Sequence, residues 1–104
     1  MVDLRKKLRS GMIAVTRRER YLILTDCETK YYGRQKLCLI NSAGFMVGTN
    51  YKEDLSSGSY TINALYKPTV DSATYRMKIK NQDLIWARYP TNLKELIISR
   101  RFSE

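Results

Sequence analysis

Short apolar runs separated by turn-forming residues occupy most of this chain of 104 residues. The runs are rich in Tyr, Ile, Val and Thr, which are enriched in strands because their side chains pack well on a pleated surface. Short runs of this kind at regular spacing are typical of sandwiches and barrels. The sequence therefore predicts a mainly β fold, a small antiparallel barrel or sandwich of about six to seven strands, with a short helix at one or both ends.

Five of the expected strands lie between residues 12 and 66. A turn at Ser10 and Gly11 leads into the first, and the charged segment 17–20 forms a tight loop between the first and the second. A second hairpin is expected around 42–44, and the fifth strand ends before Pro68, because proline cannot donate to a β-ladder. The expected strands span 12–16, 21–27, 36–41, 45–49 and 61–66.

The clearest alternation of apolar and basic residues lies in segment 75–80. Side chains of a strand alternate between its two faces, so the apolar residues at 75, 77 and 79 are expected to face a core. The basic residues between them, which would line the other face, are Arg76, Lys78 and Lys80. Residues 81–83 are expected to turn the chain, so that 84–88, which carries the only tryptophan, Trp86, returns as the partner strand.

The chain is expected to form one domain, with a β core at 10–90 between a basic segment at 1–9 and a C-terminal segment at 91–104. Leu4 and Leu8 have the spacing of one or two helical turns, although segment 1–9 could instead be flexible. Asn92 and Glu95 have the spacing of a capping box, which predicts a short helix with Leu93, Leu96 and Ile97 on one face. Residues 96–98 also fit a closing strand. Polar segments 28–35 and 52–59 are expected to be loops.

Net charge indicates a binding protein. Nineteen Lys and Arg residues against ten Asp and Glu give +9, and there is no histidine. A surplus of this size favours a polyanionic or acidic partner. Without histidine, neither a Ser-His-Asp nor a Cys-His site can form, and the five scattered glycines form no phosphate loop. We therefore expect no enzyme activity, no cofactor and no metal site.

The expected location is the cytoplasm of a host cell. No apolar stretch approaches the roughly 20 residues of a membrane span, and no apolar region follows the basic N-terminal segment as in a secretory signal. Cys27 and Cys38 each lie within an apolar run. Buried reduced thiols are therefore expected, in keeping with a reducing compartment and with no membrane contact.

Candidate binding residues fall into three groups of basic and aromatic side chains. Basic side chains can bind phosphates, and tyrosine rings can stack on unpaired bases. The groups are the hairpin loop with Arg17, Arg18 and Arg20, the polar segment with Lys30, Tyr31, Tyr32 and Arg34, and the outward row Arg76, Lys78 and Lys80. A charged row on a strand also serves simply to solvate the strand and to discourage edge pairing, and this alternative stays open.

Several short motifs resemble a family of small proteins, without an assigned activity, from phages and prophages of Gram-positive bacteria. They are Leu8-Arg9-Ser10-Gly11-Met12, residues 17–24, Ala43-Gly44-Phe45, Tyr51-Lys52-Glu53-Asp54-Leu55, residues 62–68 and Leu84-Ile85-Trp86-Ala87-Arg88. Members of that family carry a glycine in the first hairpin loop, where this chain has Arg18-Glu19-Arg20. The resemblance implies a small β-rich, barrel-like fold and a mobile-element origin.

That resemblance raises the expectation of a counter-defence role. The first functional hypothesis is a non-enzymatic inhibitor, like an anti-CRISPR protein, which binds a bacterial defence nuclease or nucleoprotein through its basic surface. The alternative is a general nucleic-acid-binding accessory protein of a phage or mobile element. The expected partners are accordingly a defence effector or nucleoprotein, or DNA or RNA contacted directly.

Overall fold

The computed structural model describes residues 2–29, 33–68, 70–71, 76–77 and 79–104, with only the backbone described at 27–29, 33–36, 70–71 and 76. Eight strands are present in this part of the chain. They are β1 (Ile13–Val15), β2 (Arg20–Thr29), β3 (Gly33–Ile40), β4 (Met46–Gly48), β5 (Ala64–Tyr66), β6 (Val70–Asp71), β7 (Arg76–Met77) and β8 (Leu84–Ala87). Short 3-10 helices span η1 (Leu4–Lys7), η2 (Gly58–Tyr60) and η3 (Asn81–Asp83), and the single α-helix described is α1 (Leu93–Phe102).

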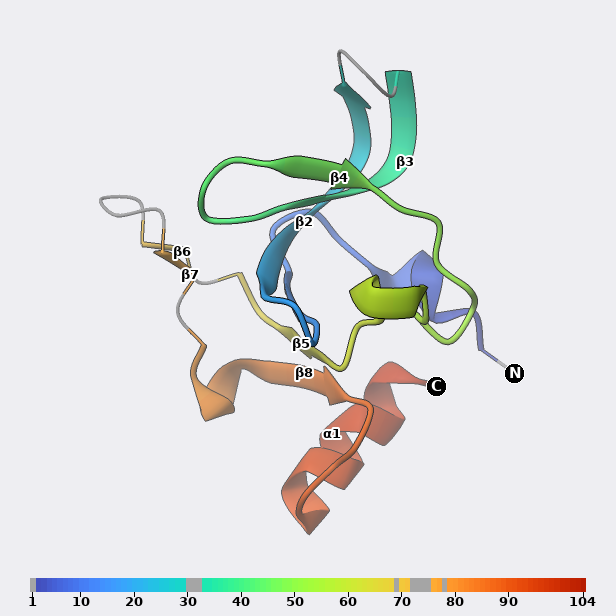
Figure 1. Cartoon of the computed structure of the whole chain (residues 1–104). Coiled ribbons are helices and arrows are strands. Elements are labelled where there is room, and N and C mark those ends of the chain that lie inside the picture. The colour runs from blue at the N-terminus through green and yellow to red at the C-terminus, as the bar shows by residue number, and fades with distance from the viewer. Residues whose placement is uncertain (1, 30–32, 69, 72–75, 78) are drawn as a thin grey trace.

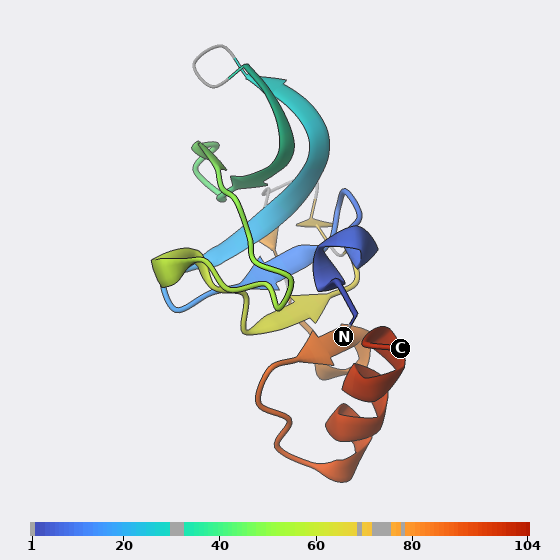
Figure 2. The same ribbon diagram turned by 90° about the vertical axis from the view of Figure 1, so that its right-hand side faces the viewer.

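Six strands form one antiparallel sheet in the order β4-β3-β2-β1-β5-β8, and β6 pairs with β7 alone. The mainly β class is therefore confirmed. The sheet is not closed into a barrel, because β4 and β8 are its two edge strands in the described part of the chain. Figures 1 and 2 show the β2–β3 hairpin extending at one end of the molecule and α1 lying at the other.

The expected hairpin between segments 75–80 and 84–88 does not form. Residues 81–83 do turn the chain, as η3, but β8 then pairs with β5, and β7 pairs with β6. The sequence pattern correctly indicated a strand and a turn, but the expected pairing of these two strands with each other was wrong. Alternation of apolar and polar residues does not say which strands pair. Segment 28–35 was also wrongly expected to be a loop, since β2 continues to Thr29 and β3 begins at Gly33.

One face of the sheet carries the core. Ala14, Tyr21, Leu65 and Trp86 lie in register across β1, β2, β5 and β8, and all four are buried. Residues outside the sheet complete the same cluster: Leu4, Leu8, Tyr51, Leu55 and Ile62. Since Leu4 lies in η1 and Leu8 follows it, the N-terminal segment packs on the core, which confirms the expected helical turn and excludes a flexible tail over these residues.

The turn before β1 requires glycine. Gly11 has a φ of +96°, and a Cβ at this position would lie 3.3 Å from the ring of Pro68. A left-handed backbone and a close neighbour are both tolerated by glycine alone. The expected turn at this position is confirmed.

Cys38 is fully buried and disulfide-bonded. The expectation of reduced thiols is therefore wrong for this residue. Disulfides are typical of oxidising compartments, so Cys38 does not support the expected reducing cytoplasm.

The helix α1 covers the edge strand β8. Asn92 caps its first turn, because the side-chain oxygen accepts a hydrogen bond from the backbone N–H of Glu95 (2.9 Å). The expected capping box is confirmed in part, since the Glu95 carboxylate accepts from Thr91 and from Nδ2 of Asn92 and not from the backbone N–H of Asn92. The Oγ atom of Ser99 accepts a hydrogen bond from the backbone N–H of Ala87 (2.9 Å), and Phe102 lies 6.4 Å from Trp86 between ring centroids. The helix thus occupies an edge that would otherwise be open to strand pairing.

Replacing Ser99 by alanine is expected to lower the free energy of unfolding by about 1–3 kcal/mol, because it leaves a buried N–H of Ala87 without an acceptor. Urea denaturation measures this change, and amide hydrogen exchange at Ala87 should become faster. The matched control is Ser42→Ala at an exposed turn position, which should change stability by less than about 0.5 kcal/mol. Equal effects of the two substitutions would refute the role assigned to Ser99.

Candidate functional site

The end of the β1–β2 hairpin is held in a fixed conformation by Thr16, which is buried at the end of β1. Its hydroxyl accepts hydrogen bonds from the backbone N–H groups of Arg18 (3.1 Å) and Glu19 (3.3 Å) and donates to the carbonyl of Glu19 (3.0 Å). A threonine hydroxyl commonly organises a turn in this way. The loop that carries the expected binding arginines is therefore a defined turn.

Arg18 is held against η2. Its guanidinium lies 5.2 Å from the ring centroid of Tyr60, and Nη1 lies 3.4 Å from the Ser59 hydroxyl. Tyr60 in turn contacts the buried ring of Tyr21, at 6.0 Å between centroids. Burial raises the pKa of Tyr21, and the nearby Glu19 carboxylate raises it further. The cation–π contact fixes the direction of Arg18 while leaving the residue exposed.

Arg20 connects the hairpin to β7. Its Nη1 atom donates a hydrogen bond to the carbonyl oxygen of Met77 (3.1 Å), and Met77 itself is buried. Two of the expected basic groups, the hairpin loop and the strand that follows Tyr75, are therefore neighbours. The side chain of Arg76 and all of Lys78 lie outside the described part of the structure.

Three exposed cations on this side of the molecule have no side-chain hydrogen bond or ion pair among the described residues. They are Arg17 at the hairpin end, Lys80 at the start of η3, and Lys67 after β5. The backbone places Lys67 beside η3, because its N–H donates to the carbonyl of Asp83 (2.9 Å), whose own N–H donates to the carbonyl of Lys80 (2.9 Å). Lys67 was missed in the sequence, since only the pairing of β5 with β8 brings it to η3.

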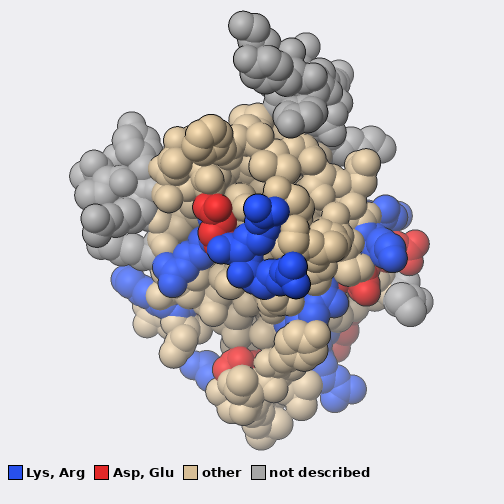
Figure 3. Space-filling model, viewed as in Figure 1, with Lys and Arg blue, Asp and Glu red and all other residues tan. Residues whose placement is uncertain are grey.

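Figure 3 shows lysine and arginine side chains gathered across the centre and left of one face, over the β1–β2 hairpin and toward the β6–β7 hairpin, with an acidic group at the edge of the cluster. We define the hairpin face as the cations of the β1–β2 hairpin together with the two beside η3; they are Arg17, Arg18, Arg20, Lys67 and Lys80. Arg18 and Arg20 are anchored by their contacts, whereas Arg17 lies in the turn, Lys67 follows β5 and Lys80 precedes η3.

Other cations serve the fold. The guanidinium of Arg88 donates to the carbonyls of Ile62 (3.0 and 3.1 Å) and Asp54 (2.6 Å) and lies 5.2 Å from the ring centroid of Trp86. Lys7 donates to the carbonyls of Phe102 and Glu104 at the end of α1, where a positive charge is favourable to the helix dipole. Arg88 and Lys7 are thus already engaged within the molecule.

Asp54 and Asp3 both lie beside cations. Hydrogen bonds from the Ser56 hydroxyl and N–H lower the pKa of Asp54, and the charge of Arg88 lowers it further. A hydrogen-bonded ion pair with Arg5, at 2.7 Å, lowers the pKa of Asp3. Both carboxylates are exposed or partly exposed and already paired, so neither resembles a general base awaiting a substrate.

The expected stacking residues Tyr31 and Tyr32, and the neighbouring Lys30, lie outside the described residues, as does the side chain of Arg34. The structure places only the strands around them, β2 and β3, which form the extended hairpin in Figure 1. Their place in a binding surface stays a prediction.

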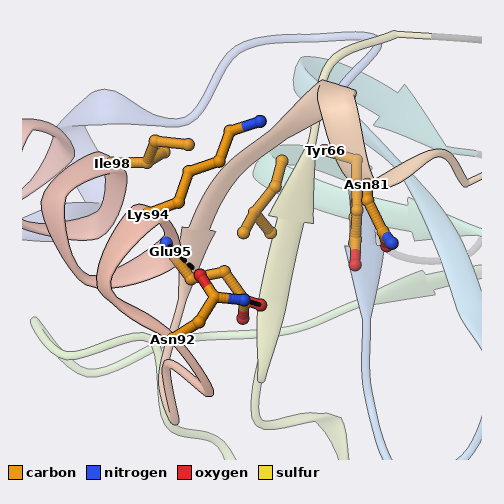
Figure 4. Close-up of a pocket in the computed structure, with 7 residues that line it drawn as sticks. Tyr66, Asn81, Asn92, Lys94, Glu95 and Ile98 are labelled. Carbon is orange, nitrogen blue, oxygen red and sulfur yellow. Dashed lines mark hydrogen bonds between the residues drawn. The ribbon is translucent and has the colours of Figure 1, made fainter.

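A small pocket of about 110 Å³ lies between the start of α1, η3 and the sheet. Figure 4 shows Lys94, Asn81 and Tyr66 around it, with the Glu95 carboxylate turned toward Asn92, which donates to it from Nδ2 (2.9 Å). Pockets that enclose small-molecule ligands usually measure about 300–1,000 Å³. Among the described residues no group of three or more Cys, Asp and Glu could hold a metal ion.

The chain matches no protein-family model, no curated protein and no solved structure. None of the helices in the described ranges is long and apolar enough to cross a membrane. The described residues form a small, mainly β protein whose β1–β2 hairpin carries exposed arginines, two of them held by Tyr60 and by the carbonyl of Met77.

Proposed function

We propose that this protein is a non-enzymatic inhibitor of phage or prophage origin, which binds a nucleoprotein such as a bacterial defence nuclease through its hairpin face. In this proposal the face covers phosphates of guide or target nucleic acid and prevents the effector from using them. The inhibitor would act in the bacterial cytoplasm, in the manner of anti-CRISPR proteins.

The observation that supports the proposal is that the hairpin face combines anchored cations with cations that make no hydrogen bond or ion pair among the described residues. Arg18 and Arg20 are held by Tyr60 and by the carbonyl of Met77, so little side-chain freedom is lost when they meet a ligand. Arg17 has no such contact among the described residues, and its charge is available to a phosphate. Basic surfaces gain affinity for nucleic acids by releasing counterions from the phosphate backbone.

Reversal of three charges tests the hairpin face. The variant Arg17→Glu, Lys67→Glu, Lys80→Glu changes exposed side chains that make no hydrogen bond or ion pair among the described residues, so its fold should be retained. Binding to a labelled DNA or RNA duplex is measured between 50 and 200 mM salt by fluorescence anisotropy, with and without reductant because Cys38 is disulfide-bonded. For three lost phosphate contacts, the slope of log affinity against log salt should become shallower by about 2.7.

The matched control is Lys6→Glu, Lys52→Glu, Arg101→Glu, which changes the net charge by the same amount at exposed positions in and near η1 and in the last turn of α1. It should retain most of the affinity and of the salt slope of the unmodified protein. Equal losses in both variants would mean that only net charge matters, and would refute a localised face. Absence of binding by the unmodified protein at low salt would refute direct phosphate contact.

Inhibition is tested separately from binding. A panel of purified bacterial defence nucleases, each loaded with its guide or target nucleic acid, is assayed for cleavage with the unmodified protein and with both charge variants. Inhibition of an effector that the hairpin-face variant fails to inhibit supports the proposal. Binding of free nucleic acid without inhibition of any effector would favour the alternative, a general nucleic-acid-binding accessory protein.

A further inference from the structure

The helix α1 has two unlike faces, and its more apolar face points away from the protein. The residues that pack on the molecule recur at helical spacing and are Glu95, Ile98, Ser99 and Phe102. The opposite side carries Leu93, Leu96 and Ile97, whose exposed fractions are 71%, 43% and 45%. The sequence correctly placed these three on one face, but that face does not meet the core.

One cation lies within this outer face and two lie beside it. At about 100° per residue, Arg100 falls between Leu93 and Leu96 around the helix, and Lys94 and Arg101 lie beside Ile97 on the other flank. All three cations are exposed and make no side-chain hydrogen bond or ion pair among the described residues. Glu95, the only acidic residue within α1, lies on the packed side and is hydrogen-bonded to Thr91 and Asn92. The outer face therefore carries an apolar stripe, and all of its charged residues are cations.

A second copy of this chain is a poor occupant of this face. In an antiparallel pair of α1 helices centred on Ile97, Arg100 of one copy would meet Lys94 of the other, and in a parallel pair Arg100 would meet Arg100. Like charges brought together in this way are destabilising. The net charge of +9 on each chain adds repulsion at longer range.

An anionic membrane surface fits less well than a protein. Helices that lie in a membrane interface place their cations on the polar side and their apolar residues toward the lipid. In α1 the position of Arg100 is inside the apolar stripe, so the stripe cannot enter the lipid without it. A charged side chain in the hydrocarbon region is costly, whereas a protein groove can place a carboxylate opposite it.

We propose that the outer face of α1 is a docking surface for a protein that has an apolar groove bordered by Asp and Glu side chains. Leu93, Leu96 and Ile97 would enter the groove, as the apolar residues of an amphipathic helix do in helix-in-groove recognition. The flanking Lys94 and Arg101 would pair with the carboxylates at its border, and Arg100 with a carboxylate inside the groove, since arginine is favoured in protein interfaces. The positive face and the acidic border are complementary in charge.

The apolar stripe of this docking surface is separate from the hairpin face, although Lys94 lines the pocket beside η3 together with Tyr66 and Asn81, the chain neighbours of Lys67 and Lys80. Figures 1 and 2 both place α1 at the end of the molecule beyond β8, whereas the hairpin face lies over the β1–β2 and β6–β7 hairpins. The proposal therefore does not depend on the proposed function, and variants of one surface should leave binding at the other unchanged.

The test uses two synthetic helical-hairpin peptides whose paired helices form the same leucine-lined groove, bordered by glutamates in one peptide and by lysines in the other. The unmodified protein should bind the acidic peptide at least about tenfold more tightly than the basic one, by fluorescence anisotropy. The variant Leu93→Ser, Ile97→Ser should weaken binding of the acidic peptide by about tenfold or more, and the variant Arg100→Glu should weaken it as well. Binding of nucleic acid should be unchanged in both.

The matched control is Phe45→Ser, because Phe45 is exposed to the same 71% as Leu93 but lies beside β4. This variant should bind the acidic peptide as the unmodified protein does. Equal affinity for the two peptides, or an unchanged affinity in the Leu93→Ser, Ile97→Ser variant, would overturn the proposal. Binding to vesicles of phosphatidylglycerol that depends on Leu93 and Ile97, or concentration-dependent dimerisation that they abolish, would overturn it in favour of a membrane or a second copy.

Discussion

Replacing Trp86 by alanine is expected to lower the free energy of unfolding by about 3–5 kcal/mol, a large part of the total stability of a domain of this size. Trp86 is 6% exposed and lies in the core row with Leu65 on β8 and β5. Its ring also contacts Phe102 of α1 and the guanidinium of Arg88. The substitution therefore leaves a cavity at the point where the sheet, the helix and the loop at Ile62 meet.

Urea denaturation followed by circular dichroism measures this loss, since the variant has no tryptophan fluorescence. The matched control is Tyr89→Ala, three residues further along the chain, where the ring is 76% exposed. This control should change stability by less than about 0.5 kcal/mol. If Trp86→Ala costs no more than Tyr89→Ala, the helix and β8 do not pack as described. The more conservative Trp86→Phe should lie between the two, because it retains an aromatic ring.

Local structure was predictable where neighbouring residues determine it. The glycine turn at Gly11, the hairpin around residues 42–44, the turn at 81–83 and the Asn92 cap of α1 all follow from short motifs. Each depends on backbone conformations or hydrogen bonds between residues a few positions apart. For that reason the motif and the structure agree without knowledge of the rest of the fold.

Pairing between distant strands was not predictable in the same way. The spacing of segments 75–80 and 84–88 fits a hairpin, yet β8 joins β5, with a register shift between Leu65 and Tyr66. Both pairings satisfy the same alternation of apolar and polar residues. The difference lies in the core: pairing with β5 places Trp86 beside Leu65 and the core, and a local hairpin would not.

Helical spacing identified the apolar stripe of α1 but not its orientation. The pattern at Leu93, Leu96 and Ile97 is the one that usually faces a core. The helix instead turns Ser99 and Phe102 inward, where the Ser99 hydroxyl completes the hydrogen bonding of β8 and Phe102 reaches Trp86. A polar residue that satisfies a strand edge can thus decide which face of a short helix is buried.

The net charge follows directly from the sequence, whereas the positions of the cations in the fold could be predicted only in part. The sequence identified Arg17, Arg18 and Arg20 as a group, and the structure brings Arg20 to β7 through the carbonyl of Met77. The sequence did not indicate that Arg88 and Lys7 donate hydrogen bonds to backbone carbonyls, because those contacts join residues 26 to 97 positions apart. Net charge alone therefore overstates the charge that a partner can use.

Ionisation of Tyr51 is expected to destabilise the protein above pH 10. Tyr51 is buried in the core, and its hydroxyl donates to the carbonyl of Tyr60 (2.7 Å). Burial raises the pKa of Tyr51 far above its usual value of about 10, and the neighbouring Tyr21 and Tyr60 raise it further. The folded protein therefore keeps this proton at pH values where the unfolded chain has lost it. The contribution of Tyr51 to the free energy of unfolding is fully present below pH 10. Above pH 10 it falls by about 1.4 kcal/mol for each pH unit.

The variant Tyr51→Phe isolates this effect. At pH 7 it should be less stable by about 1 kcal/mol, because the hydrogen bond to Tyr60 is lost. Above pH 10 the variant has no hydroxyl at position 51 to ionise. The free energies of unfolding of the variant and of the unmodified protein should therefore become equal roughly one pH unit above pH 10. The measurement is urea denaturation at pH 7 to 12, with Tyr89→Phe, an exposed position, as the control that should follow the unmodified protein throughout. Curves for Tyr51→Phe and the unmodified protein that stay parallel to pH 12 would mean that Tyr51 ionises as readily when folded as when unfolded, contrary to its buried position against Tyr60.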